Sequence, residues 1–246
     1  MRLSYSSYAT YATCPLRYHL EREYPLRGPE YADLLIGRYM HRFFYNLMDF
    51  WDVEKNANEI WKEIKSGRKL IYSDELCSEF EDIRDMQSYY SSLKNTLILS
   101  NSEERYLDKI RRIMEISSKL SWKLRGKDYR KEVRMYSKVG DVQVFGIADL
   151  MGKDEILELK TGKINGYELQ IAFYSLIFYL NNYILPRAKL VSLYTGELRE
   201  IKLSVKLIEN LYSEINKTAS RIKKGIFTPR RGDWCIYCPY RSVCSQ

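Results

Sequence analysis

The sequence predicts an α/β fold in which a central mixed β-sheet is flanked by helices. Three observations predict this class: a helical pattern over residues 1 to about 125, a β-rich region that begins at 129, and a return to helix after it. Apolar side chains recur every three or four residues in the first region and every second residue in the next. With 246 residues and 45% hydrophobic content, the chain can bury one large core, with or without an insertion.

The first region is expected to be helical throughout. The segment at 31–51 carries apolar residues at mixed three- and four-residue spacing, which is typical of a helix with one buried face. Charged amphipathic stretches follow at roughly 53–66, 74–99 and 102–124. No cluster of turn-forming residues separates them, so no domain boundary is predicted here.

The second region is expected to form a β-meander. Period-two alternation runs through the segments 131–139, 141–151 and 155–162, and glycine-containing turns separate them. A helix is predicted next at about 166–182. Two short strands near 188–195 and 198–203 and an amphipathic helix to about 224 should complete the sheet and its cover.

Four of the five cysteines lie at the two extremes of the chain. Cys235, Cys238 and Cys244 are spaced so that three thiolates can point at one centre, and Cys14 is the natural fourth ligand. Cys77 stands alone in mid-chain. In a reducing compartment, an odd cysteine count with CxxC spacing favours metal ligation over disulfides. Zinc and iron–sulfur sites both use such pairs, so these residues alone leave the metal open.

The composition points to an acidic partner. The net charge is +8 and the pI is near 9.1, and nucleic acid is the commonest partner of such proteins. The 22 tyrosines, interleaved with Lys and Arg, could stack single-stranded bases while the cations follow the phosphates. The same richness in Tyr, Ile, Lys and Glu is also expected of a heat-adapted protein, so a thermophilic source is predicted.

No feature of the sequence predicts export or a membrane span. The chain has no run of eighteen or more apolar residues, and its first residues lack the apolar centre of a signal peptide. We therefore expect a cytoplasmic protein that does not enter the membrane.

The candidate chemistry lies in the second strand pair of the meander. Glu158 and Lys160 are two residues apart and project from one face of their strand. A two-residue loop at Lys153-Asp154 would place Asp149 directly opposite Glu158, with Cβ atoms roughly 4.5–5.5 Å apart. Carboxylates this close repel each other unless a proton or a metal intervenes. Each residue also has an ordinary interpretation, as a turn aspartate or as part of a solvated strand face.

These residues resemble a known family. GIAD, then ELK, then Gln170 and Tyr174 in ELQIAFYSL follow the order and spacing of the PD-(D/E)xK nuclease superfamily in its RecB-like branch. With the four terminal cysteines added, the chain resembles the CRISPR-associated RecB-like exonucleases, the fourth Cas family. The resemblance spans essentially the whole chain, from CPLRYHL to CIYCPYRSVC.

The resemblance implies roles for individual residues. His41, in a GxxxH motif, would be a metal ligand beside Asp149 and Glu158, and the backbone carbonyl of Leu159 would complete the coordination of Mn²⁺ or Mg²⁺. Lys160 would orient the attacking water and stabilise developing charge. Further implied roles go to Gln170 and Tyr174, which would position the metal site and DNA, and to Cys14, Cys235, Cys238 and Cys244, which would hold a [4Fe-4S] cluster.

The resemblance also implies a domain layout. Residues 1–246 would form a single RecB-like nuclease domain. Within it, 1–30 and 225–246 would together form the iron–sulfur module, 42–128 a helical insertion, and 129–204 the catalytic β-core. The insertion is longer than a minimal nuclease of this kind needs, and it could cap the active site or dock a partner.

The expected function is that of a metal-dependent exonuclease acting on single-stranded DNA ends. The resemblance places it in CRISPR spacer acquisition, where it would process prespacers alongside the integrase complex, as a monomer or a homo-oligomer. One alternative is an iron–sulfur RecB-like nuclease of recombination, repair or a virus. Another is a non-catalytic DNA-end-binding adaptor, against which the complete set of Asp149, Glu158 and Lys160 argues.

Overall fold

The computed structural model describes residues 1–26, 32–49, 103–124 and 127–244. The elements in these ranges are β1 (Arg2–Ser4), α1 (Tyr5–Thr13), α2 (Pro15–Glu23), α3 (Ala32–Asp49), α7 (Glu103–Leu124), β2 (Arg130–Val139), β3 (Val142–Met151), β4 (Glu155–Lys160), α8 (Glu168–Asn182), β5 (Arg187–Ser192), β6 (Leu198–Ile201), α9 (Val205–Lys223) and the 3₁₀ helix η1 (Asp233–Tyr237). The helices expected at 53–66 and 74–99, and Cys77, lie outside the described residues.

The strands form one mixed sheet in the order β1-β3-β4-β5-β6, with β2 paired to β3. The pairs β2–β3, β3–β4 and β5–β6 are antiparallel, whereas β1–β3 and β4–β5 are parallel. The predicted meander and mixed sheet are thus confirmed. The parallel step from β4 to β5 requires a crossover, and α8 supplies it.

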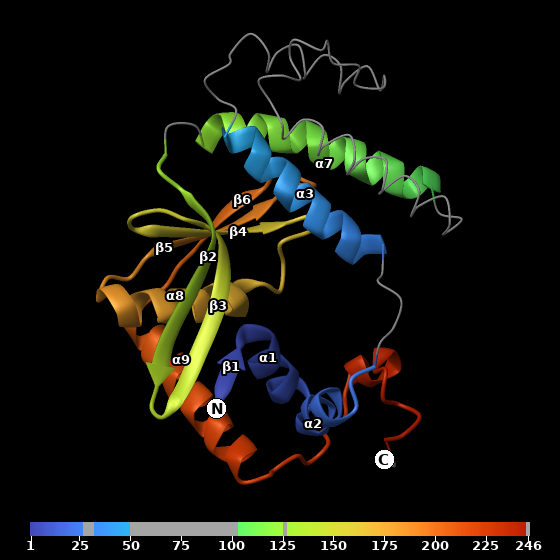
Figure 1. Cartoon of the computed structure of the whole chain (residues 1–246), viewed down its shortest axis with the longest axis vertical. Helices are drawn as coiled ribbons and strands as arrows, with labels where there is room; N and C mark the ends of the chain where they lie inside the picture. The colour runs from blue at the N-terminus through green and yellow to red at the C-terminus, as the bar shows by residue number, and fades with distance from the viewer. Residues whose placement is uncertain (27–31, 50–102, 125–126, 245–246) are drawn as a thin grey trace.

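Helices cover both faces of the sheet (Figure 1). On one face, α8 and α9 pack with α1 over a core that includes Val144, Phe173 and Ile215. On the other face, α3 and α7 pack against each other over a second core that includes Phe44, Leu157 and Val191. This α3–α7 pair brings a helix from the N-terminal region to the sheet that follows it in sequence.

One strand was not predicted. Arg2–Ser4 form β1, although the first region was expected to be helical. The strand pairs in parallel with Gln143–Phe145 of β3, about 140 residues later in the chain. Three residues are too few to show a periodic pattern, so the pairing is decided by tertiary contact rather than by local sequence.

The sheet divides at β3. Its first edge pairs with β2 over most of its length, whereas its second edge pairs with β1 at Gln143–Phe145 and with β4 only at Leu150 and Met151. Residues 146–149 therefore have no ladder partner on the second edge among the described strands. The candidate active site lies in this gap.

Candidate active site

Asp149 lies where both ladders that flank β3 are interrupted. The register that pairs Met151 with Ile156 and Leu150 with Leu157 would next pair Asp149 with Glu158, as predicted from the two-residue loop, but the ladder ends before that pair. The Asp149 carboxylate instead accepts a hydrogen bond from the backbone N–H of Leu159 at 2.7 Å. Across the other edge, the position opposite Asp149 is Glu132, which has a left-handed φ of 48° and no ladder pair.

Helix α3 supplies two further groups to Asp149. Nδ1 of His41 lies 3.4 Å from Oδ1 of Asp149, and the hydroxyl of Tyr45 donates to the same oxygen at 3.0 Å. His41 and Tyr45 are four residues apart and therefore share one face of the helix. Oδ1 of Asp149 thus accepts a hydrogen bond from α3, and Oδ2 accepts one from β4. Together these contacts hold the carboxylate in a defined orientation.

Glu158, Lys160, Gln170 and Tyr174 form a continuous hydrogen-bond network. Oε1 of Glu158 accepts from Lys160 Nζ at 2.9 Å and from Gln170 Nε2 at 2.6 Å. The Gln170 side chain also accepts from Lys160 at 2.9 Å and donates to the Tyr174 hydroxyl at 3.1 Å. The Gln-x3-Tyr spacing on α8 therefore brings both side chains to the strand that carries Glu158 and Lys160.

Gly146 makes room for this network. A β-carbon added at Gly146 would lie 2.5 Å from Cε1 of Tyr174, which is closer than side chains approach one another. Tyr174 is buried, so its ring has little space to withdraw. The glycine of GIAD is therefore required by the close passage of the Tyr174 ring over β3.

The two carboxyls have opposite pKa shifts. Burial by itself would raise the pKa of Asp149, but the hydrogen bond and positive charge of His41, the Leu159 N–H and the charge of Lys160 together lower it. Burial and then the negative charge of Asp149 raise the pKa of Glu158 well above its usual range, against the opposing charge of Lys160. Without a cation, Asp149 is the ionised member of the pair and Glu158 tends to hold a proton.

The donor set fits a hard divalent cation. Two carboxylates and an imidazole are ligands suited to Mg²⁺ or Mn²⁺, and Oε2 of Glu158 is buried without a hydrogen-bond partner among the described residues. Within that same part of the chain, no three His, Cys, Asp or Glu side chains are close enough together to form a ready single-ion site. Ligation by Glu158 would thus accompany loss of its proton.

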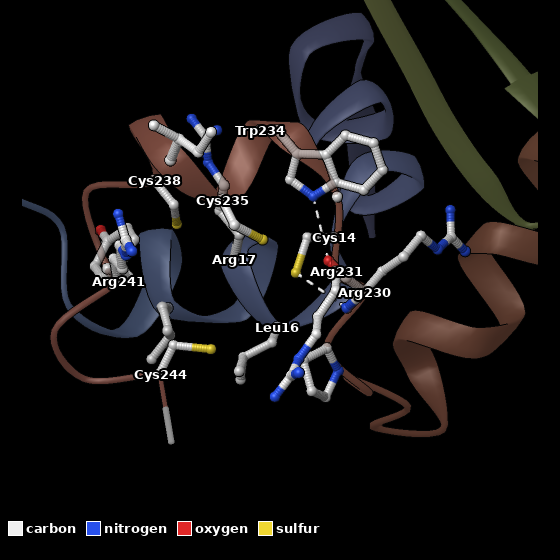
Figure 2. Close-up of a pocket in the computed structure, with 15 residues that line it drawn as sticks. Cys14, Leu16, Arg17, Arg230, Arg231, Trp234, Cys235, Cys238, Arg241 and Cys244 are labelled. Atoms are coloured by element: carbon white, nitrogen blue, oxygen red, sulfur yellow. Dashed lines mark hydrogen bonds between the residues drawn. The ribbon is translucent and has the colours of Figure 1, made fainter. Parts of the chain in front are cut away.

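The four terminal cysteines line one cavity of about 340 Å³ (Figure 2). Cys14 immediately precedes α2 and is buried, whereas Cys235, Cys238 and Cys244 come from η1 and the segment after it and are partly exposed. The backbone N–H of Arg230 points at the Cys14 sulfur at 3.5 Å. The four cysteines thus line one cavity, although their side chains, like the other His, Cys, Asp and Glu side chains of the described residues, include no group of three arranged to hold a metal ion.

Direct hydrogen bonds also join the chain ends around this cavity. The Tyr11 hydroxyl donates to the backbone oxygen of Ile226 at 2.6 Å, and the Tyr240 hydroxyl donates to that of Tyr24 at 2.9 Å. Arg230 donates to the backbone oxygen of Ala12. Residues near the two ends of the chain are therefore joined by direct protein contacts.

A family model described as the PD-(D/E)XK nuclease superfamily matches residues 2–245, nearly the whole chain. This chain belongs to the PD-(D/E)XK nuclease superfamily. The mixed sheet flanked by helices is consistent with the core of this superfamily of nucleases, and nucleic acid is the expected partner.

Solved structures support the fold. A presumed exonuclease from Eubacterium rectale aligns over 100% of this chain and 90% of its own, with a TM-score of 0.50 and 17% identity. A second solved structure, described as SSO0001, aligns over 94% of both chains at 16% identity with a TM-score of 0.36, which is too low to support an argument. The search of curated proteins gave no significant match.

Three residues at the site of this superfamily nuclease were not predicted. Tyr45 donates a hydrogen bond to Asp149, and Gly146 leaves space for the Tyr174 ring. The Tyr167 ring lies 4.1 Å from Lys160 Nζ in a cation–π contact. Tyr45 follows His41 by one helical turn, and this spacing was the available signal. Tyr167 lies just before α8, where no sequence pattern marks it.

None of the helices in the described part of the chain combines the length and apolar character that crossing a bilayer requires.

Proposed function

We propose that this superfamily nuclease is a Mg²⁺- or Mn²⁺-dependent deoxyribonuclease that hydrolyses phosphodiester bonds at single-stranded DNA ends. The observation that carries the proposal is the joined network in which Glu158, Lys160 and Gln170 bond one another beside Asp149. A structural ion pair would need no second buried carboxyl next to it. A nuclease needs both carboxyls for its cation and the ammonium for its substrate.

Each residue has a role that follows from its position. Asp149 and Glu158, with His41 and the carbonyl of Leu159, would hold the cation. The bound cation would supply an activated water and polarise the scissile phosphate. Lys160, fixed by Glu158 and Gln170, places its positive charge where the attacking oxygen and the phosphate develop negative charge. Tyr174 fixes Gln170, and through it Lys160.

The test is cleavage of end-labelled single-stranded and duplex DNA with Mg²⁺ or Mn²⁺. Wild type should shorten the single strand, and Glu158→Gln should reduce the rate by roughly 10²–10³. Glu209→Gln, on the exposed surface of α9, is the matched control and should cleave as wild type does. Undiminished cleavage by Glu158→Gln would refute the assignment, and a wild type that binds DNA ends without cutting would favour the adaptor function.

We propose in addition that Cys14, Cys235, Cys238 and Cys244 hold a [4Fe-4S] cluster. Support comes from the shared cavity of the four thiols and the Arg230 N–H directed at one of them. Anaerobically purified protein should be brown, with about four irons and four sulfides per chain. A colourless protein that contains stoichiometric zinc would show instead that the four cysteines bind zinc.

The biological role that we propose is trimming of DNA fragments before CRISPR integration, rather than recombination, repair or a viral process. The support is the sequence resemblance of the cysteine pattern and nuclease motifs, taken together, to the fourth Cas family. Reconstitution with the CRISPR integrase should yield integrated fragments of trimmed length, whereas Glu158→Gln should leave them untrimmed. Light scattering of the purified protein alone and with the integrase gives the oligomeric state.

A further inference from the structure

The β2–β3 hairpin has one face that the described helices leave open. Along β2, side chains at alternate positions are exposed: Arg130, Glu132, Arg134, Tyr136 and Lys138. The antiparallel register places Ile147 opposite Arg134, Phe145 opposite Tyr136, and Gln143 opposite Lys138. Directly paired residues share a face of the sheet. We call the set Arg134, Tyr136, Lys138, Phe145 and Ile147 the hairpin face.

The opposite side of the hairpin accounts for its packing. Met135, Val139, Val142 and Val144 are buried in the core formed with α8 and α9. Helices α8 and α9 both contact β2 (Figure 1). Folding therefore needs the buried side chains and does not explain the apolar residues on the hairpin face, where Tyr136 and Ile147 are each 47% exposed.

The hairpin face combines aromatic and cationic groups. The rings of Tyr136 and Phe145 lie 6.3 Å apart and nearly parallel, at 23°, and therefore form a flat aromatic surface. Arg134 and Lys138 flank it and form no ion pair with any residue that the structure describes. Of the exposed side chains on this face of β2, only Glu132 is acidic. Such alternation suits a polyanion with flat bases better than an apolar protein surface.

The hairpin face leads to the candidate active site. Ile147 precedes Asp149 by only two residues on β3, at the point where the alternation of faces breaks, because Ala148 packs in the core beneath α8 and Leu150 in the core beneath α3. From Asp149 back to Gln143, the strand covers roughly 20 Å. A single strand whose scissile phosphate lies at Asp149 could thus extend along the hairpin for several nucleotides.

We propose that the hairpin face binds the single-stranded DNA adjacent to the nucleotide being cleaved, with bases against Tyr136, Phe145 and Ile147 and phosphates beside Arg134 and Lys138. This inference rests on the proposed nuclease function and adds where the rest of the substrate lies. Recognition would be independent of sequence because every base has an aromatic face.

The first experiment measures binding without cleavage. Fluorescence anisotropy of a labelled oligothymidylate of about 15 nucleotides is recorded with Glu158→Gln protein over a series of salt concentrations. When Tyr136→Leu is introduced into the Glu158→Gln protein, binding should weaken about fivefold or more because base stacking is lost. When Arg134→Gln and Lys138→Gln are introduced together into the same protein, the negative slope of log affinity against log salt should become shallower by about 1.4, which corresponds to two phosphate contacts.

Matched controls lie on other exposed surfaces. Lys206→Gln with Lys217→Gln removes two cations from α9, and Tyr183→Asn removes an aromatic ring that is 85% exposed. Asparagine suits the left-handed backbone at residue 183. These variants should bind as the parent protein does. Thermal unfolding of every variant checks that the hairpin remains folded.

The second experiment separates this inference from the nuclease proposal. In otherwise wild-type protein, hairpin-face substitutions should raise KM for a 15-nucleotide substrate and leave kcat nearly unchanged, whereas Lys160→Met should lower kcat. Cleavage with parent-like affinity in the hairpin-face variants would overturn the inference and leave the nuclease intact. If wild type is inactive but its DNA binding still depends on the hairpin face, the nuclease proposal would be overturned and the hairpin-face inference would stand. Variants that change self-association but not DNA binding would assign the face to a second copy of the chain and overturn the inference.

Discussion

The backbone N–H of Leu159 donates to the carboxylate of Asp149, at the point where the ladder between β4 and β3 has already ended. A side chain on one strand thus completes the hydrogen bonding of the other strand's backbone. The β3–β4 ladder has no pair beyond Leu150 and Leu157, and Asp149 and Glu158 lie just past that end. The sheet keeps its hydrogen bonds and gains a site at its centre.

Removing the Tyr45 hydroxyl should weaken the cation site. Tyr45→Phe keeps the buried ring but deletes the hydrogen bond to Oδ1 of Asp149, which orients that carboxylate. Loss of such an outer partner typically costs 10–100-fold in metal affinity or activity. The measurement is cleavage rate against Mn²⁺ concentration, where the midpoint should move upward. Tyr183→Phe, whose side chain is exposed, should leave the midpoint in place.

Adding one methyl group at Gly146 should destabilise the protein. Gly146→Ala places a β-carbon against the buried Tyr174 ring, and overpacking of this kind costs about 1–3 kcal/mol. For a chain of this size, each kcal/mol lowers Tm by roughly 2–4 °C. Gly162→Ala, where the added carbon meets nothing within 4 Å, is the control.

A double variant identifies the cause of that loss. If the clash with Tyr174 is responsible, Gly146→Ala combined with Tyr174→Ala should be less destabilised than the sum of the two single changes. Strict additivity would place the strain elsewhere.

Acid should weaken the ion-pair network at the start of β4. Burial alone would raise the pKa of Glu155, but its hydrogen bonds from Lys189 and Tyr129 and the charges of Lys189 and Lys127 lower it to about 2. The pKa is depressed in the folded protein, so the stabilisation is fully present above pH 4.5 and is lost as pH falls toward 2. It is of order 1–3 kcal/mol.

Denaturant unfolding of wild type and Glu155→Gln between pH 3 and 7 measures this effect. The stability difference between the two proteins should be constant near neutrality and should shrink below about pH 4.5. A difference that stays constant to pH 3 would show that the charge of Glu155 contributes nothing.

Gln170 should affect the rate of cleavage by holding the Lys160 ammonium in position. Gln170→Leu removes the acceptor of one Lys160 hydrogen bond and the donor to Glu158, which leaves the ammonium free to move. We expect kcat to fall by about 10–100-fold with little change in KM, because the binding surface is untouched. Gln170→Glu restores an acceptor but adds charge, so its pH profile should differ from that of wild type. Identical profiles and rates for all three proteins would contradict the positioning role.

Local pattern predicted most of the described elements because their periodicity is long and regular. The register of β3 with β4 followed from a short turn, and it brought Asp149 to the level of Glu158 as expected. The interruption of the ladder there did not follow, because it coincides with contacts to Asp149 from α3, which is far away in sequence. Tyr45 was missed because its spacing from His41 is a weak signal among 22 tyrosines, and only its tertiary contact with Asp149 singles it out.

The hydrogen bonds between the chain ends bear on the order in which the protein can be made. Tyr11 and Tyr24 emerge from the ribosome more than two hundred residues before their partners Ile226 and Tyr240. The nascent chain must therefore carry the earlier segment without these hydrogen bonds until the later segment has been made. If the four cysteines hold a cluster, as we propose, its insertion must likewise wait until Cys235, Cys238 and Cys244 have been added to the chain that already carries Cys14.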